Sequence, residues 1–267
     1  MNAGRLGERG LARLRRDLSA RDLGIIGHVG DLRLMSVGQI EALCFPSEAH
    51  KSALSARRVC RRVLERLTRD HLLVRVERRI GGVSAGSAGY VYALGPVGAR
   101  LLSAGSGRRH FREPSGAFVD HTLAIAQLAV DLTVSARSGA FDVVELQAEP
   151  RCWRQMSNLG GRTVLRPDLF VSLGIGELEH RLFIEVDRGS EHLPTLVRKC
   201  QLYTAYYRTG REQDAHGVFP RVCWVLPNER RAQQLTRVLD RSAHLVDGLF
   251  RITTTERALS ELSEGKV

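Results

Sequence analysis

Apolar residues in the first part of the chain recur first with the spacing of helices and then with that of strands. Ser36 and either Ser52 or Ser55 precede apolar runs of helical period, and serine favours the N-cap of a helix. Pro46 ends the run that follows Ser36, because proline cannot continue a helix. The glycine-rich stretch 81–89 then separates two strand-like runs. The pattern predicts helices at 20–34, 37–45 and 52–70, strands at 72–79 and 90–94, and a short helix at 96–102.

The third expected helix has two opposite faces. Its apolar residues, from Ala56 to Leu67, fall within one arc at about 100° per residue, and its arginines fall within the opposite arc together with Glu65. An arginine-faced helix followed by a hairpin is typical of a winged helix-turn-helix, whose third helix enters the major groove of DNA. Arginines on the helix would contact phosphates and base edges, and those of the hairpin would contact the backbone or the minor groove. The candidate DNA-binding residues are Arg57, Arg58, Arg61, Arg62, Arg66, Arg75, Arg78 and Arg79.

The net charge of the chain is +11, and the whole excess lies in its first part. Residues 1–112 hold 21 Lys and Arg against 9 Asp and Glu, a net charge of +12, whereas residues 113–267 hold 19 against 20, a net charge of −1. A basic region joined to a neutral one favours a polyanion-binding module attached to a part with another role. A merely solvated arginine-rich surface, or a winged helix that binds protein, remains the alternative.

The second part of the chain alternates between helical and strand-like patterns, which predicts a mixed sheet flanked by helices in an α/β layout. The expected elements are a helix at 118–137, strands at 141–146, 164–173 and 181–187, a helix at 191–208, a strand at 219–226, a helix at 229–239, a strand at 249–253 and a helix at 256–262. The stretch before them is rich in Gly, Ser and Arg and has no period, as in a linker. The expected domains are a basic arm at 1–19, a winged helix at 20–103, a linker at 104–117 and a mixed α/β domain at 118–267.

The overall composition excludes several classes of protein. With 43% hydrophobic and 26% charged residues, the chain is neither a disordered tail, a collagen-like fibre nor a small disulfide scaffold. The five cysteines are odd in number and form no CxxC pair, which indicates reduced thiols. The apolar runs are shorter than a membrane span needs, and the N-terminus lacks the apolar core of a secretory signal. We therefore expect a cytoplasmic protein with no membrane partner.

Acidic residues follow or precede several of the expected strands. Asp168 opens one strand, and Glu185 and Asp187 end the next, where period-two alternation places both on one face. If these strands pair as a hairpin, Asp168 comes close to Glu185, and Glu149 at the end of the preceding strand could add a ligand. Converging carboxylates suit Mg²⁺, with Mn²⁺ as a substitute, and such an ion activates water and stabilises charge on a phosphate. Lys199 on the next helix could bring a positive charge to that phosphate.

Other catalytic motifs are missing from the sequence. No two of the nine histidines are spaced as HxH, which excludes the relaxases that combine a tyrosine nucleophile with such a metal site. The chain also lacks the P-loop motif of ATPases and the G-x-S-x-G motif of hydrolases. Tyr203, Tyr206 and Tyr207 lie on a predicted helix, where packing is the simpler interpretation and attack on a phosphate the alternative.

Several stretches of the chain resemble the replication-relaxation family of actinobacterial and plasmid-associated proteins. They are RRVCRRVLERLTRDHLL from Arg57, YVYALGPVGARLL from Tyr90, DHTL from Asp120, RPD from Arg166, FIEVDRGSE from Phe183 and RKCQLYTAYY from Arg198. The resemblance implies a winged helix followed by a domain with the PD-(D/E)XK restriction-endonuclease-like core. It also implies kinship with one class of plasmid mobilisation relaxases, which nick DNA at a transfer origin.

The resemblance also implies roles for individual residues. Asp168 matches the aspartate of the PD motif, and Glu185 matches the first acid of (D/E)XK. Asp187 stands where that motif has lysine, the residue that orients or activates water. Lys199 could supply this charge from the helix, as migrated lysines do in the superfamily. The candidate catalytic residues are thus Asp168, Glu185, Asp187 and Lys199, and the candidate metal ligands are Asp168, Glu185 and Glu149.

Two hypotheses of different classes follow. In the first, the protein serves plasmid or mobile-element replication or transfer as a metal-dependent nickase of double-stranded DNA. In the second, it is a non-catalytic DNA-binding factor or transcriptional regulator, and the nuclease-like domain is a scaffold for dimerisation or for a replication or transfer partner. Asp187 in place of lysine favours the second hypothesis, whereas the combination of Asp168, Glu185 and Lys199 favours the first. The sequence leaves open whether the protein forms a homodimer.

Overall fold

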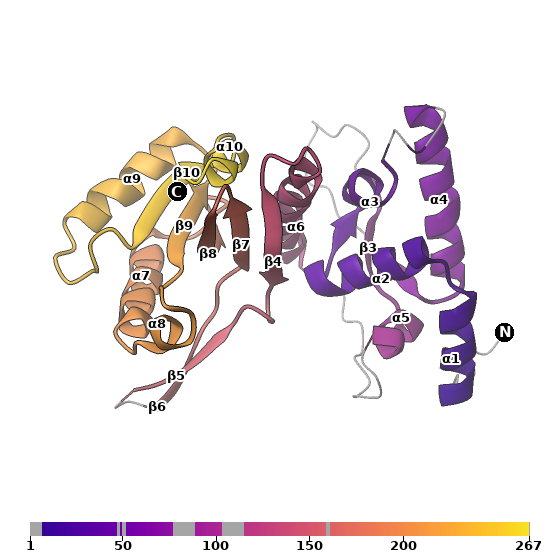
Figure 1. Cartoon of the computed structure of the whole chain (residues 1–267), viewed down its shortest axis with the longest axis horizontal. Coiled ribbons are helices and arrows are strands. Elements are labelled where there is room, and N and C mark those ends of the chain that lie inside the picture. Colours follow the sequence, from indigo (N-terminus) through magenta and orange to yellow (C-terminus); the bar gives the residue numbers. More distant parts are fainter. Residues whose placement is uncertain are drawn as a thin grey trace. The chain divides into compact units, whose positions relative to one another are not determined.

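The computed structural model describes residues 7–46, 49, 52–76, 89–102, 115–158 and 161–266 (Figure 1). The chain divides into two compact units, Met1–Val130 and Asp131–Val267. This division falls inside helix α6, Gly116–Ala136. Most of the linker expected at 104–117 and of the loop expected at 81–89 lies outside the described residues. The mixed α/β class expected from the sequence is confirmed for the chain as a whole.

The first unit combines helices with a small antiparallel sheet of strand order β1-β3-β2. The arm expected at 1–19 contains a helix, α1, and the expected strand at 90–94 pairs with β2 on one side and with the unexpected two-residue strand β1 on the other. The elements before α6 are α1 Glu8–Asp17, α2 Ala20–Leu32, β1 Met35–Ser36, α3 Val37–Cys44, α4 Ala53–Arg69, β2 Leu73–Val76, β3 Val91–Leu94 and α5 Pro96–Leu102.

Serine caps fix where three of these helices begin. Ser19 and Ser36 form reciprocal capping boxes with the third helical residue of α2 and α3, and the Ser52 hydroxyl accepts a hydrogen bond from the Ser55 backbone N–H at 3.2 Å. The cap predicted at Ser36 is therefore confirmed, and of the two alternatives Ser52 and Ser55, Ser52 is the cap of α4. A cap of this kind satisfies backbone N–H groups that would otherwise have no partner in the first turn.

Two glycines allow β3 and α5 to pass close to the end of α4. A Cβ at Gly95 would lie 2.3 Å from the His71 carbonyl oxygen, and one at Gly98 would lie 2.1 Å from the Leu72 carbonyl oxygen. Both obstacles are backbone atoms, so a larger residue would force the strand and the helix apart. Glycine is required at these positions because only hydrogen fits.

The second unit is built on a five-stranded mixed sheet of order β10-β9-β8-β7-β4. β4, β7 and β8 form an antiparallel meander, whereas β8, β9 and β10 run parallel and are joined by helical crossovers. A separate hairpin, β5–β6, is inserted between β4 and β7. The elements are β4 Asp142–Ala148, β5 Arg154–Asn158, β6 Gly161–Leu165, β7 Leu169–Ile175, β8 Leu178–Val186, α7 Leu193–Tyr207, α8 Arg211–His216, β9 Arg221–Leu226, α9 Glu229–Asp240, β10 Phe250–Thr254 and α10 Ala258–Ser263.

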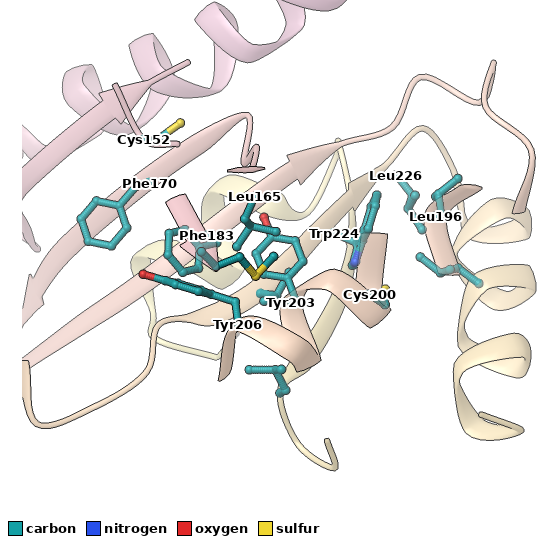
Figure 2. Packing of buried hydrophobic residues seen from close by; sticks show 14 of the residues in the cluster. Cys152, Leu165, Phe170, Phe183, Leu196, Cys200, Tyr203, Tyr206, Trp224 and Leu226 are labelled. Atoms are coloured by element: carbon teal, nitrogen blue, oxygen red, sulfur yellow. The ribbon is translucent and has the colours of Figure 1, made fainter. Parts of the chain in front are cut away.

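Helices α7 and α9 contribute to one apolar cluster with the side chains of one sheet face (Figure 2). Phe183 is at its centre, with ring centroids 5.6 Å from Phe170 and 5.7 Å from Tyr203. Trp224 and Tyr203 are the largest fully buried side chains of the molecule that the structure describes. Close packing of this kind holds α7 rigidly over the sheet, which matters because α7 carries Lys199.

The single strand predicted at 164–173 is wrong, because the chain forms two strands there. β6 ends at Leu165 and β7 begins at Leu169. Pro167 lies between them, and proline has no N–H to donate to a sheet. The break turns the chain from the hairpin into the central sheet, so that Asp168 stands at the entrance to β7.

Helix α6 is long and apolar enough to cross a membrane by length and composition alone, although no membrane span was expected from the sequence. Its most apolar window has a mean hydropathy of 1.3 and is 44% buried. Such a helix is weak evidence for a membrane protein, since core helices of globular proteins pass the same test. In the first unit, Val119 packs with Leu34, Val76 and Val91 in a buried cluster. This packing is that of a core helix.

Candidate functional site

Three acidic residues lie on or directly beside neighbouring strands at one end of the five-stranded sheet. The Glu149 N–H donates to the Asp168 carbonyl oxygen at 3.2 Å, and the Asp168 N–H donates to the Ile184 carbonyl oxygen at 3.2 Å. These bonds continue the antiparallel pairing of β4, β7 and β8, and Glu185 follows next on β8. The pairing expected between the strands of Asp168 and Glu185 is therefore confirmed. We call Glu149, Asp168 and Glu185 the acidic row.

Both carboxylate oxygens of Glu185 are held by side chains of α7. The Lys199 ammonium lies 2.6 Å from Oε2, and the Tyr203 hydroxyl donates to Oε1 at 2.6 Å. Glu185 has no exposed surface, whereas the Lys199 side chain keeps 30% of its own. Lys199 and Tyr203 are one helical turn apart, so they reach the same carboxylate from one face of the helix.

The environment changes the titration of all three groups. The pKa of Glu185 is raised to about 7, mainly because burial disfavours the carboxylate and secondly because Asp168 lies near, while Lys199 and Tyr203 oppose the shift. Burial lowers the pKa of Lys199, but Glu185 and Asp168 outweigh burial, and the net pKa lies above its ordinary value. Burial and Glu185 both raise the pKa of Tyr203, so its hydroxyl remains a donor. The cluster thus joins a charged lysine to a carboxyl that titrates near neutral pH.

Asp168 is held by the neighbouring strand. It is 5% exposed, and its Oδ2 accepts a hydrogen bond from the Val186 N–H at 2.7 Å. This bond fixes the carboxylate beside the end of β8, next to Glu185. Within the described part of the chain, no group of three or more His, Cys, Asp or Glu side chains is arranged to hold a metal ion. Glu149 therefore shares the acidic row through its backbone, without completing a three-carboxylate cluster.

Asp187 has partners different from those of Glu185. Its Oδ2 accepts from Arg231 Nε at 2.7 Å, and its Oδ1 accepts from the Gly189 N–H at 2.8 Å. Arg231, on α9, also donates to the Glu191 carbonyl oxygen. The side chains of Asp187 and Arg231 are only 2% and 14% exposed. The pair therefore fastens the loop that follows β8 to α9.

Most of the candidate DNA-binding arginines of α4 lie on its solvent side. Arg58, Arg61 and Arg62 are exposed, and Arg57 is exposed while it pairs with Glu41 at 3.2 Å. The apolar arc of the same helix is buried: Ala56, Cys60, Val63, Leu64 and Leu67 belong to the core. The two opposite faces predicted for this helix are confirmed, and the exposed arginines form a basic surface on it.

The other candidate arginines differ in their contacts. Arg66 is half-buried and donates to Asp22 Oδ1 of α2 at 2.6 Å. Burial would raise the pKa of Asp22, but the hydrogen bonds from Arg66 and Ser19 outweigh it and lower that pKa. Arg66 thus ties α4 to α2. Arg75 is exposed, with its guanidinium 4.4 Å from the centre of the Tyr90 ring, and Arg78 and Arg79 lie outside the described residues.

The profile of the replication-relaxation family matches residues 26–222, which include α4, the acidic row and Lys199. The chain belongs to the replication-relaxation family. Membership associates it with plasmid replication and confirms the resemblance inferred from the sequence. No curated protein matches the chain, and no solved structure matches it.

Sequence reasoning missed the roles of two residues in this replication-relaxation protein. Tyr203 was expected to pack, and it does, but it also donates to Glu185; its spacing of four residues from Lys199 was the available signal. Arg231 had no such signal, because it lies 44 residues from Asp187 and beyond the family match. The two residues mark the buried contacts that keep the end of β8 in place.

Proposed function

We propose that this replication-relaxation protein is a DNA-binding protein of plasmid or mobile-element replication or transfer, and that its second unit is a metal-dependent nickase of double-stranded DNA. The first unit would be a winged helix, and the second a domain of the PD-(D/E)XK type. The observation that carries the proposal is the 2.6 Å contact between Lys199 and Glu185 beside Asp168. These are the acid, acid and lysine that such a site requires, with the lysine supplied by α7.

The order of elements supports both fold assignments. In the first unit, α2, α3 and α4 precede strands β2 and β3, with β1 as the third strand of the small sheet, which is the arrangement of a winged helix. From α6 onward, a helix, an antiparallel meander of three strands, a helix and a parallel strand follow one another along the chain as α6, β4, β7, β8, α7 and β9, apart from the inserted hairpin and α8. This is the order expected for a restriction-endonuclease-like core.

The exposed arginines of α4 support DNA binding by the first unit. Arg58, Arg61 and Arg62 lie on the solvent side of a helix whose other side is anchored in the core. A rigid helix with such a face can enter the major groove and place guanidinium groups against phosphates and base edges. The contact of Arg66 with Asp22 assigns that residue to the fold, so Arg66 is the weakest candidate of the set.

The donor chemistry of the acidic row fits a hard divalent cation. Asp168 and Glu185 are buried carboxylates close enough that Asp168 raises the pKa of Glu185, and a cation would relieve this repulsion. Asp168 and Glu185 would hold Mg²⁺ or Mn²⁺, with Glu149 as the neighbouring carboxylate. When bound, the ion would polarise a phosphate oxygen and lower the pKa of a water molecule. Asp187 is not in this set, because Arg231 and Gly189 occupy its oxygens.

The remaining residues of the site would hold and orient these groups. Tyr203 donates to one oxygen of Glu185 and fixes the plane of its carboxylate. Lys199 neutralises the other oxygen, and its partly exposed side chain carries the cation of the cluster that a DNA phosphate could reach. The pair of Asp187 and Arg231 holds the chain that leaves β8.

A second function is favoured by one specific observation. Glu185 has no exposed surface, and both of its oxygens are engaged by Lys199 and Tyr203. A carboxylate that is saturated in this way resembles a structural ion pair as much as a metal ligand. In this alternative the protein binds DNA without cutting it, and the second unit is a scaffold for dimerisation or for a partner protein.

A supercoiled-plasmid assay distinguishes the two functions. The plasmid carries the protein's own genomic neighbourhood, and the reaction is run with Mg²⁺ and with Mn²⁺ for the wild type, Asp168→Asn and Glu185→Gln. We expect open circles from the wild type alone, with DNA binding retained by all three proteins in a gel shift. If the wild type shifts the plasmid without nicking it, the non-catalytic function is correct.

A further inference from the structure

The β5–β6 hairpin differs in charge from the rest of the second unit. Residues 150–167 contain four arginines and no Lys, Asp or Glu. The remainder of the unit, residues 131–149 and 168–267, holds 15 Lys and Arg against 18 Asp and Glu. A basic element in an otherwise acidic unit creates a local field that attracts anions.

The hairpin begins and ends at the acidic row. It leaves the sheet after Glu149 and returns at Asp168, and the bond from the Glu149 N–H to the Asp168 carbonyl oxygen, 3.2 Å long, closes its base. In Figure 1 the hairpin extends away from the five-stranded sheet of its own unit. A polymer that reached Asp168 and Glu185 would therefore meet this hairpin beside them.

The base of the hairpin is anchored in the core, which gives the arm a fixed direction. Cys152, Met156 and Leu165 are buried in the apolar cluster of the second unit. Arg154 Nε lies 2.9 Å from Glu212 Oε1, and Arg154 Nη1 donates to the Cys152 carbonyl oxygen at 2.8 Å. Arg154 is thus engaged in contacts within the second unit, and we do not include it among the arginines that could bind DNA.

Three other arginines are exposed around the hairpin and contact neutral groups. Arg162 donates to the Gln155 side-chain oxygen at 3.0 Å, and Arg211 of α8 donates to the Gln155 carbonyl oxygen at 2.7 Å. The Arg166 guanidinium lies 4.9 Å from the centre of the Trp153 ring. These contacts orient the three guanidinium groups without cancelling their charge.

We propose that the β5–β6 hairpin is a DNA-contact arm, and that its Arg162 and Arg166, together with Arg211 of the neighbouring helix α8, bind phosphates of the strand that enters the acidic row. The inference rests on the proposed function and deepens it, because it names the surface that would hold DNA at Asp168 and Glu185. A guanidinium fork matches two phosphate oxygens, so arginine suits this task better than lysine. The contacts are to the backbone, and they contribute affinity without reading sequence.

The arm is tested by fluorescence anisotropy with the full chain and a labelled mixed-sequence DNA duplex over a range of salt concentrations. The test protein is the double variant Arg162→Gln/Arg166→Gln. We expect its affinity at low salt to fall about tenfold and the slope of log K against log salt to become shallower by about 2, since each lost phosphate contact removes about 0.9. The matched control, Arg237→Gln/Arg241→Gln, removes two exposed arginines at and just after the end of α9 and should bind like the wild type.

A conservative variant separates charge from folding. Arg162→Lys/Arg166→Lys keeps both charges and should retain the dependence of affinity on salt. A salt slope as shallow as that of the glutamine variant would contradict the proposal that the hairpin binds DNA phosphates. Equal losses from the hairpin variant and the α9 control would also overturn it, because binding would then follow the charge of the unit as a whole.

The same binding assay distinguishes failure of the hairpin proposal from failure of the proposed DNA-binding function. If Arg58→Ala/Arg62→Ala weakens binding while the hairpin variant binds like the wild type, the arm is wrong and the DNA-binding function stands. If the wild type binds no duplex at any salt concentration, the proposed function fails and the arm fails with it.

Discussion

Arginines of the first unit lie on the solvent side of α4, whereas Asp168 and Glu185 of the acidic row in the second unit are buried. Exposed charges add little to stability and remain available to a partner. Buried charges must be paired where they stand, and the loss of one partner is costly because the other charge remains buried. Loss of a charged side chain should therefore have different consequences in the two units: loss of affinity in the first and loss of stability in the second.

Removal of the Lys199 cation, which pairs with the buried Glu185, should give the largest effect. Lys199→Met leaves the Glu185 carboxylate buried with only Tyr203 as a partner, and we expect a loss of about 3–5 kcal/mol of unfolding free energy at pH 8. Urea unfolding measures it. The double variant Lys199→Met/Glu185→Gln should recover part of the loss, because no charge remains buried. A loss below about 1 kcal/mol in the single variant would mean that the pair is not buried as described.

Glu185 should make the stability of the protein depend on pH in a defined window. Its pKa is raised to about 7 in the folded state, above the ordinary value of 4.5, so its contribution is fully present below about 4.5 and is lost as the pH rises through about 7. Between these limits the wild type should lose up to about 3 kcal/mol relative to Glu185→Gln. Urea unfolding of both proteins at pH 4.5, 6 and 8 measures the difference; parallel curves would contradict the raised pKa.

Exposed and paired charges can also be compared within the first unit, because Arg66 of α4 pairs with the buried Asp22. Arg66→Met leaves Asp22 without this partner, and we expect a loss of about 1–3 kcal/mol. Arg62→Met on the exposed face of the same helix is the matched control and should change stability by less than about 0.5 kcal/mol. Similar urea midpoints for the two variants would remove the distinction between them.

The exposed arginines should have the smallest effect on stability and a clear effect on DNA. Arg58→Ala/Arg62→Ala should stay within about 0.5 kcal/mol of the wild type in urea unfolding. Its affinity for duplex DNA should fall about tenfold, with a salt slope shallower by about 2. Unchanged affinity in the anisotropy titration would mean that α4 is not the helix that docks on DNA.

Local signals explain how much of the fold could be predicted. Ser36 and Ser52 predicted the starts of two helices, because a cap is a contact within four residues of the chain. The two faces of α4 could be predicted from the helical spacing of its apolar residues. Strand β5, with the sequence RQMSN, was not predicted, because its residues do not alternate between apolar and polar. Its stability comes from pairing with β6. Pro167 could be recognised in the sequence, but only the tertiary structure shows that the chain passes from the hairpin to the five-stranded sheet there.

The site divides in the same way. Asp168, Glu185 and Lys199 could be predicted as a set, because each lies at an identifiable place on a strand end or on the following helix. The pairing of Asp187 with Arg231 could not be predicted, because it joins the end of β8 to helix α9, which follows strand β9. The burial that raises the pKa of Glu185 also depends on the packing of α7, which no local pattern encodes.

The proposed nickase activity requires that Asp168 and Glu185 form a site for a divalent cation. Calorimetric titration of the protein with Mn²⁺ near pH 7, without DNA, tests it directly, with Asp168→Asn and the exposed Asp247→Asn as the matched pair. We expect one binding event in the wild type and in Asp247→Asn, with a heat that varies with the buffer because Glu185 releases a proton, and no such event in Asp168→Asn. Absence of binding in the wild type, or equal binding in Asp168→Asn, would contradict the account.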